Sequence, residues 1–107
     1  MPKKILQPEA VPTLVQERLH TWGNCIKAQR ITQGIHRADL CARMGISDNT
    51  LRRLERGDSR PSAGLYFSAM YVLGMLDIAS PPLPRSLLTS ERQRVRSSKK
   101  DILDDDF

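Results

Sequence analysis

Apolar residues recur at helical spacing near the start of the chain. Four of them fall at i, i+4, i+7 and i+11, on one stripe of a helix; they are Val15, Leu19, Trp22 and Ile26. Thr13 precedes the stripe and Gln16 follows three residues later, and this capping-box spacing predicts that Thr13 is the N-cap. Because residues 32–34 read Thr-Gln-Gly, we expect this helix to end at about residue 31.

Two short helices are predicted next, separated by a tight turn. The first spans about residues 37–44 and stops at Gly45, which can adopt the positive φ that a sharp reversal needs. The second starts at Ser47, a favourable N-cap residue, and ends at Gly57, which suits the position just beyond a helix. Ile46 lies between the two helices and is expected to fill the gap where they meet.

The longest nearly apolar stretch predicts a buried fourth helix, from Pro61-Ser62 to about residue 73, followed by a short turn around residues 75–79. Four of its residues are expected in the core: Tyr66, Ala69, Met70 and Leu73. Phe67 and Tyr71 are left over and are candidates for a dimer contact. No segment alternates apolar and polar positions as strands do. The predicted fold class is therefore all-α, with five helices around one core that includes Trp22.

Prolines and charges mark the ends of this domain. A breaker cluster at residues 80–84 separates the helical domain, residues 13–79, from a Pro-rich linker and charged tail, residues 80–107. An N-terminal arm, residues 1–12, precedes the domain, and we expect both ends to be flexible. Residues 85–100 carry six lysines and arginines against one glutamate, and residues 101–107 carry four aspartates.

The composition limits the classes of function that fit the chain. Its 107 residues are 39% hydrophobic and 5% aromatic, enough for one small core and too little for a large cleft enzyme. We see no Ser/His/Asp set, paired carboxylates or phosphate-binding glycine loop, and expect no catalytic residue and no cofactor. Cys25 and Cys41 form no CxxC motif, and His20 and His36 lack metal-ligand spacing, so no metal site is expected. The net charge of +5 indicates a polyanionic partner, most simply nucleic acid.

The terminal and apolar segments bear on location. A signal peptide has an apolar segment after its basic start, and the basic N-terminus of this chain is not followed by one. The apolar run at residues 65–76 is too short to cross a bilayer. We therefore expect a cytoplasmic, nucleoid-associated protein with no membrane partner.

Residues 37–57 have the layout of a helix-turn-helix. At about 100° per residue, Leu51 and Leu54 of its second helix face one way and four polar residues face the other; these are Asp48, Asn49, Arg52 and Arg53. Arginine and asparagine can make paired hydrogen bonds to guanine and adenine edges in the major groove. Three more arginines flank this face and are candidates for phosphate contacts: Arg37, Arg56 and Arg60. An ordinary helical hairpin with a solvated face is the alternative.

Residues 22–76 resemble the Cro/CI-type (XRE), lambda repressor-like helix-turn-helix domain. The resemblance rests on residues 38–47 through the turn and residues 50–57 in the helix that follows. It implies a sequence-specific transcriptional repressor, homodimeric on a near-palindromic double-stranded DNA operator with half-sites ~34 Å or a multiple apart. The DNA-binding residues expected from the resemblance and the charge pattern are His36, Arg37, Ser47, Asp48, Asn49, Thr50, Arg52, Arg53, Arg56 and Arg60.

Three charged residues carry more specific expectations. Asp48 could accept a hydrogen bond from a cytosine amino group, or it could simply lie at the positive end of its helix. Arg30, at the end of the first helix, and Glu55, beside the leucine face, are expected to form a buried ion pair, and the resemblance also places an Arg–Glu pair there.

The fourth helix and the tail are similar to those of HipB-type antitoxins. Those regulators also end in a basic stretch followed by acidic residues and an aromatic, as residues 92–96 and 104–107 do here. The resemblance implies a HipA-type serine/threonine kinase toxin as partner and autorepression of the toxin-antitoxin operon, with partner anchors at Ile102, Leu103 and Phe107.

Several alternatives remain at this point. The protein could be a phage-type or housekeeping repressor without a partner, or a protein-binding module that neutralises a toxin directly. The acidic end could be a solvated tail, or it could fold back on the basic residues 92–100 and weaken non-specific DNA binding. The basic stretch 85–100 could contact the DNA backbone or only keep the chain soluble.

Overall fold

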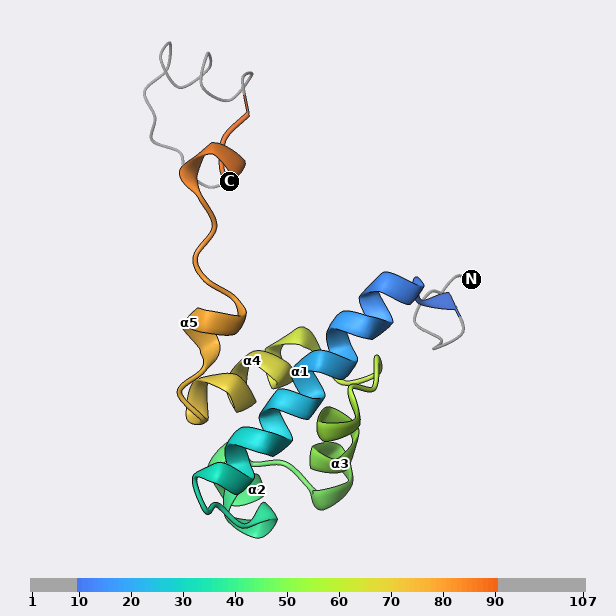
Figure 1. Cartoon of the computed structure of the whole chain (residues 1–107), viewed down its shortest axis with the longest axis vertical. Helices are drawn as coiled ribbons and strands as arrows, with labels where there is room; N and C mark the ends of the chain where they lie inside the picture. The colour runs from blue at the N-terminus through green and yellow to red at the C-terminus, as the bar shows by residue number, and fades with distance from the viewer. Residues whose placement is uncertain (1–9, 91–107) are drawn as a thin grey trace.

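The protein is a bundle of five α-helices in a computed structural model that describes residues 10–90 (Figure 1). The helices are α1 (Thr13–Thr32), α2 (Arg37–Met44), α3 (Asp48–Arg56), α4 (Ala63–Val72) and α5 (Leu76–Ala79). Within these residues there is no strand, and the predicted all-α fold with five helices is confirmed.

Residues 80–90, which follow α5, run away from the helices in Figure 1. Residues 81–90 are all exposed and include a short 3-10 helix, η3 (Arg85–Leu87). Most of the predicted arm and tail lies outside the described residues, as do the expected partner anchors Ile102, Leu103 and Phe107.

The start of α1 differs from the prediction. Thr13 is the first helical residue, and Pro12 is the N-cap, with φ −57° and ψ 145° and no side-chain capping bond. The Gln16 side chain instead donates a hydrogen bond to the carbonyl oxygen of Val11, at 3.0 Å. The capping box at Thr13 is therefore wrong. The proline ring fixes φ near the helical value and supplies a ready helix start without a hydroxyl cap.

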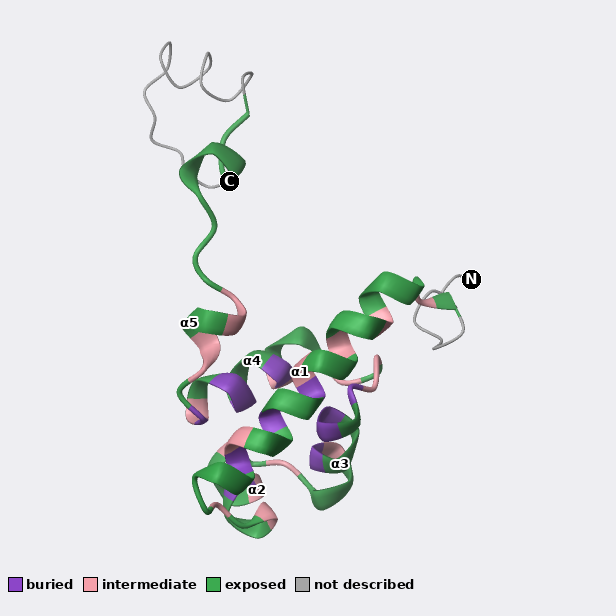
Figure 2. Ribbon diagram, in the orientation of Figure 1, coloured by how far each residue is buried: buried purple, intermediate pink, exposed green. Residues whose placement is uncertain are grey.

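The first turns of α1 extend beyond the body of the protein (Figure 2). Leu14 is 61% exposed and Val15 is 45% exposed, so Val15 lies outside the core although it shares the predicted stripe. Leu19 and Trp22 are partly buried, and Ile26 is fully buried. The stripe thus changes from exposed to buried along its length, because the other helices cover only the later turns of α1.

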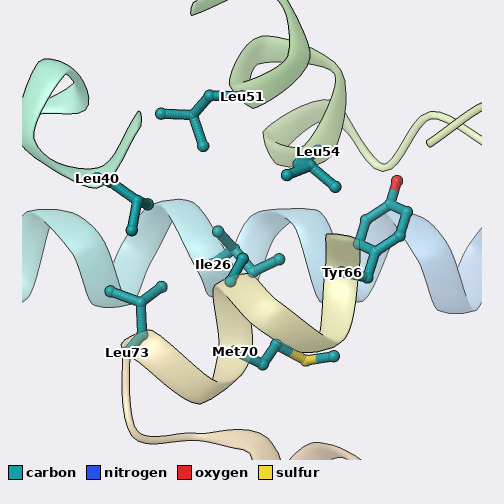
Figure 3. Close-up of a cluster of buried hydrophobic side chains, with 8 residues drawn as sticks. Ile26, Leu40, Leu51, Leu54, Tyr66, Met70 and Leu73 are labelled. Carbon is teal, nitrogen blue, oxygen red and sulfur yellow. The ribbon is translucent and has the colours of Figure 1, made fainter. Parts of the chain in front are cut away.

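The core lies where α3 and α4 pack against α1, one to either side of it in both Figure 1 and Figure 3. Its buried apolar residues are Ile26, Leu40, Leu51, Leu54, Tyr66, Ala69, Met70 and Leu73. The four core residues predicted for the fourth helix are confirmed. Trp22 lies at the rim, where its ring contacts those of Tyr66 and Phe67 at centroid distances of 5.8 and 5.6 Å.

The turn between α2 and α3 follows the predicted chemistry. Gly45 has φ 69°, a left-handed conformation that glycine adopts without steric penalty. The amide of Ile46 donates back to the carbonyl of Cys41 at 3.0 Å, and the Ile46 side chain packs against the core. Ser47 then caps α3 by accepting a hydrogen bond from the amide of Thr50 at 3.2 Å. These contacts fix the direction in which α3 leaves the turn.

Two glycines allow the middle of α1 to meet the end of α3 backbone to backbone. A Cβ on Gly23 would lie 2.5 Å from the amide nitrogen of Gly57 and 2.6 Å from the carbonyl oxygen of Leu54. A Cβ on Gly57, whose φ is +74°, would lie 2.5 Å from the Cα of His20. Real Cβ atoms do not approach other atoms so closely, so a larger residue at either position would push the two helices apart.

A buried ion pair joins α1 to α3, as the sequence predicts. The Nε atom of Arg30 donates to Oε2 of Glu55 at 2.6 Å, and Nη2 donates to Oε1 at 3.2 Å. The third guanidinium nitrogen, Nη1, donates to the carbonyl oxygen of Ile35 at 3.1 Å. Both charged residues are only 8% exposed. Each therefore depends on the other to offset the loss of hydration.

Breaking this pair from one side should destabilise the fold strongly. We expect Arg30→Met or Glu55→Leu alone to cost ~3–5 kcal/mol, because each leaves a buried charge without its partner. The double variant should lose far less, and denaturant unfolding of all three proteins measures the difference. Arg52→Met, which breaks an exposed ion pair, serves as the control and should unfold close to the parent. Single variants as stable as the parent would contradict the prediction.

Candidate nucleic-acid interface

Helix α3 has one buried face and one exposed polar face. Leu51, Leu54 and Glu55 are buried against the rest of the protein. The exposed residues are Asp48, Asn49, Arg52, Arg53 and Arg56. The predicted division of α3 into an apolar and a polar face is confirmed. The exposed face carries arginine and asparagine side chains that can donate hydrogen bonds outward.

Asp48 lies between two arginines at the start of α3. Its carboxylate accepts hydrogen bonds from Nε and Nη2 of Arg37, all at 3.1 Å, and one from Nε of Arg52 at 2.8 Å. The hydrogen bonds from Arg52 and then Arg37 lower the pKa of Asp48, so it is ionised near neutral pH. Asp48 therefore joins the first residue of α2 to the exposed face of α3, a contact that neither sequence-based alternative included.

A second carboxylate organises the other end of α3. Asp58 accepts hydrogen bonds from Nε and Nη2 of Arg60 at 3.1 and 2.8 Å, and Nη2 of Arg56 lies 3.6 Å away. The hydrogen bond from Arg60 is the main cause that lowers the pKa of Asp58 to about 2. Sequence reasoning missed this residue. The signal available was an acidic residue directly after a helix-ending glycine and between two arginines.

Asp58 is held in place by its backbone as well as by its side chain. Its amide donates to the carbonyl of Arg53 at 3.0 Å, and the amide of Gly57 donates to that of Leu54 at 3.0 Å, a Schellman ending of α3. The hydroxyl of Tyr66 donates to the carbonyl oxygen of Asp58. Burial, and next the charge of Asp58, raise the pKa of Tyr66 to about 12, so this hydroxyl keeps its proton. The loop after α3 is thus tied to the core.

The remaining predicted residues fall into two groups. Ser47 and Thr50 are engaged in capping α3, and their hydroxyl oxygens also lie 3.1 Å apart in a hydrogen bond. Asn49 and Arg53 lie on the exposed face of α3, and His36 is the exposed N-cap of α2. Within residues 10–90, Arg53 makes no ion pair, unlike the other four candidate arginines. Arg53 is therefore the arginine of α3 with all its donors available.

The two charged clusters lie at opposite ends of α3. Arg37, Asp48 and Arg52 surround its first turn, and Arg56, Asp58 and Arg60 surround its end. A helix of nine residues is ~13 Å long, at 1.5 Å per residue. Positive side chains therefore flank the exposed face of α3 at both of its ends.

Comparison with known proteins identifies the same segment. The helix-turn-helix family matches residues 26–67, from the buried middle of α1 into α4. The match spans 42 of the 107 residues, and over this segment the chain is similar to the helix-turn-helix family. No curated protein matches the chain, and no solved structure does either. None of the helices in the described part has both the length and the apolar character needed to span a membrane.

The pairing of Asp58 should make stability depend on acidic pH. Because its pKa is lowered on folding, the unfolded chain takes up a proton first as the pH falls, and this destabilises the folded state. We expect Asp58→Asn to be less stable than the parent by on the order of 1–2 kcal/mol at about pH 5. The difference should shrink as the pH approaches 2, as thermal unfolding of both proteins would measure. A difference that stays constant over this range would contradict the ionic role of Asp58.

Proposed function

We propose that the protein is a transcriptional repressor that binds a specific DNA operator, with α3 in the major groove. The observation that carries the proposal is the exposed face of α3, on a helix whose other face is buried. On this face, the side-chain donors of Arg53 and Asn49 have no partner among residues 10–90. A helix held in this way presents side chains to base edges in a fixed orientation, which sequence readout requires.

The roles of the individual residues follow from their positions. Base reading is assigned to Asp48, Asn49, Arg52 and Arg53 on α3. Phosphate binding is assigned to His36, Arg37, Arg56 and Arg60, at the start of α2 and the end of α3, while Ser47 and Thr50 lie at the first turn of α3, where backbone amides can face a phosphate. Neither an active site nor a cofactor has a part in this function.

The protein should act as a homodimer on a near-palindromic operator. One helix of nine residues reads only a few base pairs, and a second copy doubles the recognised sequence. Two-fold symmetry would place the half-sites ~34 Å or a multiple apart along the DNA. Such a repressor would work in the cytoplasm, on the nucleoid.

Substitutions should separate base reading from phosphate binding. We expect Arg53→Ala to cost ~1–3 kcal/mol on the operator and to relax the preference at one base pair, because a paired contact to guanine is lost. Arg60→Ala should weaken binding to operator and scrambled DNA alike and reduce its salt dependence. Titrations at several salt concentrations measure both effects. Arg18→Ala, on the exposed start of α1, is the matched control. An Arg53→Ala protein with unchanged affinity and preference would contradict the role of α3.

The more specific role that we propose is that of a HipB-like antitoxin. It is supported by the resemblance of the fourth helix and by the sequence of the tail, in which Ile102, Leu103 and Phe107 surround a run of aspartates. Those three residues would anchor the chain on a HipA-type serine/threonine kinase, and the complex would repress its own operon. A buried aromatic anchor is a usual form of binding hot spot.

Removing the acidic end should separate the two activities. We expect deletion of residues 101–107 to leave operator affinity within about threefold, a change under ~1 kcal/mol. Capture of a HipA-type kinase encoded in the same operon should fall at least ~10-fold, and Phe107→Ala should account for much of the loss. Parallel pull-down and operator titration test this. Equal kinase capture by all proteins would favour a repressor that uses no tail contact.

A further inference from the structure

The outer face of α4 differs from the rest of the protein surface. Four of its exposed residues fall at i, i+3, i+4 and i+7, on one side of the helix; they are Gly64, Phe67, Ser68 and Tyr71. Residues 61–76 contain no charged side chain, although 27% of the chain is charged. Solvated helix faces normally carry charges. This face therefore has the composition of a surface that another molecule covers.

Two aromatic side chains stand on this face. Tyr71 is 73% exposed and Phe67 is 37% exposed. The ring of Phe67 packs against that of Trp22, at a centroid distance of 5.6 Å and an interplanar angle of 56°. Partly exposed aromatics are enriched in protein interfaces.

No contact within residues 10–90 requires glycine at position 64. Its backbone is helical, so no positive φ requires glycine there. A Cβ at this position would meet only the hydroxyl oxygen of Ser62, at an ordinary 3.7 Å. Glycine in a helix costs about 0.5–1 kcal/mol relative to alanine. The lack of a side chain at residue 64 therefore matters only on the outer surface of α4, where it allows another molecule to approach the helix backbone closely.

We propose that the outer face of α4 pairs with the same face of a second copy, antiparallel, around a two-fold axis between residues 67 and 68. Positions at equal distances from that axis face each other in such a pair. Tyr71 of one copy then lies over Gly64 of the other, and Phe67 lies over Ser68. Each aromatic ring meets a small residue, so the face is complementary to itself.

Charge and area also favour a second copy as the partner. Two chains of net charge +5 repel each other, and an uncharged helix lets them meet without bringing like charges together. If each aromatic has ~200 Å² to bury, the exposed fractions of Phe67 and Tyr71 give on the order of 400 Å² in total from two copies. The two aromatics alone therefore supply about a third of the ~1,200 Å² at which stable interfaces begin, so the free dimer should be weak.

The pairing leaves the proposed DNA-binding face open. Helices α3 and α4 lie on either side of α1 (Figure 3). The residues of α4 that face the core are Tyr66, Ala69 and Met70, whereas Phe67 and Tyr71 are exposed. The inference rests on the homodimer in the proposed function and adds the surface through which it forms. Two-site binding to one operator would then stabilise a dimer that is weak in free solution.

Two single substitutions test the surface without disturbing the fold. Gly64→Gln replaces glycine by a better helix former at a position where a Cβ makes only an ordinary contact. Tyr71→Ala truncates an exposed side chain with no partner within residues 10–90. Sedimentation equilibrium over a concentration series should show dimerisation at least ~10-fold weaker for both, with thermal unfolding unchanged or, for Gly64→Gln, shifted upward. Ile31→Gln, at another exposed apolar residue, is the control and should dimerise like the parent.

A rescue experiment tests the register. Gly64→Glu and Tyr71→Lys should each weaken the dimer, and the double variant should recover it at low salt, because each glutamate then faces a lysine of the other copy. Recovery supports the proposed pairing. A dimer that all these substitutions leave intact overturns the α4 surface and keeps the homodimer. If the parent protein is monomeric both in free solution and when bound to operator DNA, the homodimer is overturned as well. The same operator titration reports the affinity for DNA, so the proposed DNA binding is tested separately.

Discussion

The guanidinium group of Arg30 holds three parts of the chain in place at once. Two of its nitrogens bind Glu55 in α3, and the third binds the carbonyl of Ile35 in the turn that leads to α2. The planar group fixes these directions relative to one another, which a flexible lysine would not do. The angle between α1 and α3 and the path into α2 therefore depend on a single side chain. Neither charge can be removed alone without leaving the other buried and unpaired.

The Gly23–Gly57 contact sets the distance between the helices that this ion pair orients. Because the backbones touch there, the end of α3 sits against α1, and the turn after Gly57 brings Asp58 beneath the hydroxyl of Tyr66. Tyr66 comes from α4, so the loop after α3 is fixed to the core on both sides. The position of α3 is thus fixed by the buried side chains of Leu51 and Leu54 and, at its end, by the Gly23–Gly57 contact and the hydrogen bond from Tyr66.

Much of this architecture could be read from the sequence because its signals are local. Gly45, Ser47 and Gly57 mark helix ends through backbone chemistry that acts within a few residues, and the spacing of leucines defines the buried face of α3. The prediction failed where tertiary structure decides. Val15 shares the apolar stripe but lies on an overhanging part of α1, and nothing in the spacing of Asp48 showed that Arg37 would reach it. Gly23 gave no signal, since its importance depends on a helix that lies about thirty residues further along the chain.

The carboxylates of Asp48 and Asp58 change the thermodynamics of any contact that their arginines make with an outside anion. An arginine that already donates to a carboxylate must give up those hydrogen bonds before it binds a phosphate. The free energy gained in the exchange is therefore only the difference between the two ion pairs. In return, its side chain is already ordered, and little rotamer entropy is lost on contact. The carboxylates therefore weaken non-specific attraction to an anion more than they weaken arginine–phosphate hydrogen bonds of good geometry. In the proposed repressor, these two acidic side chains would therefore favour a well-fitting polyanion over the many that merely carry charge.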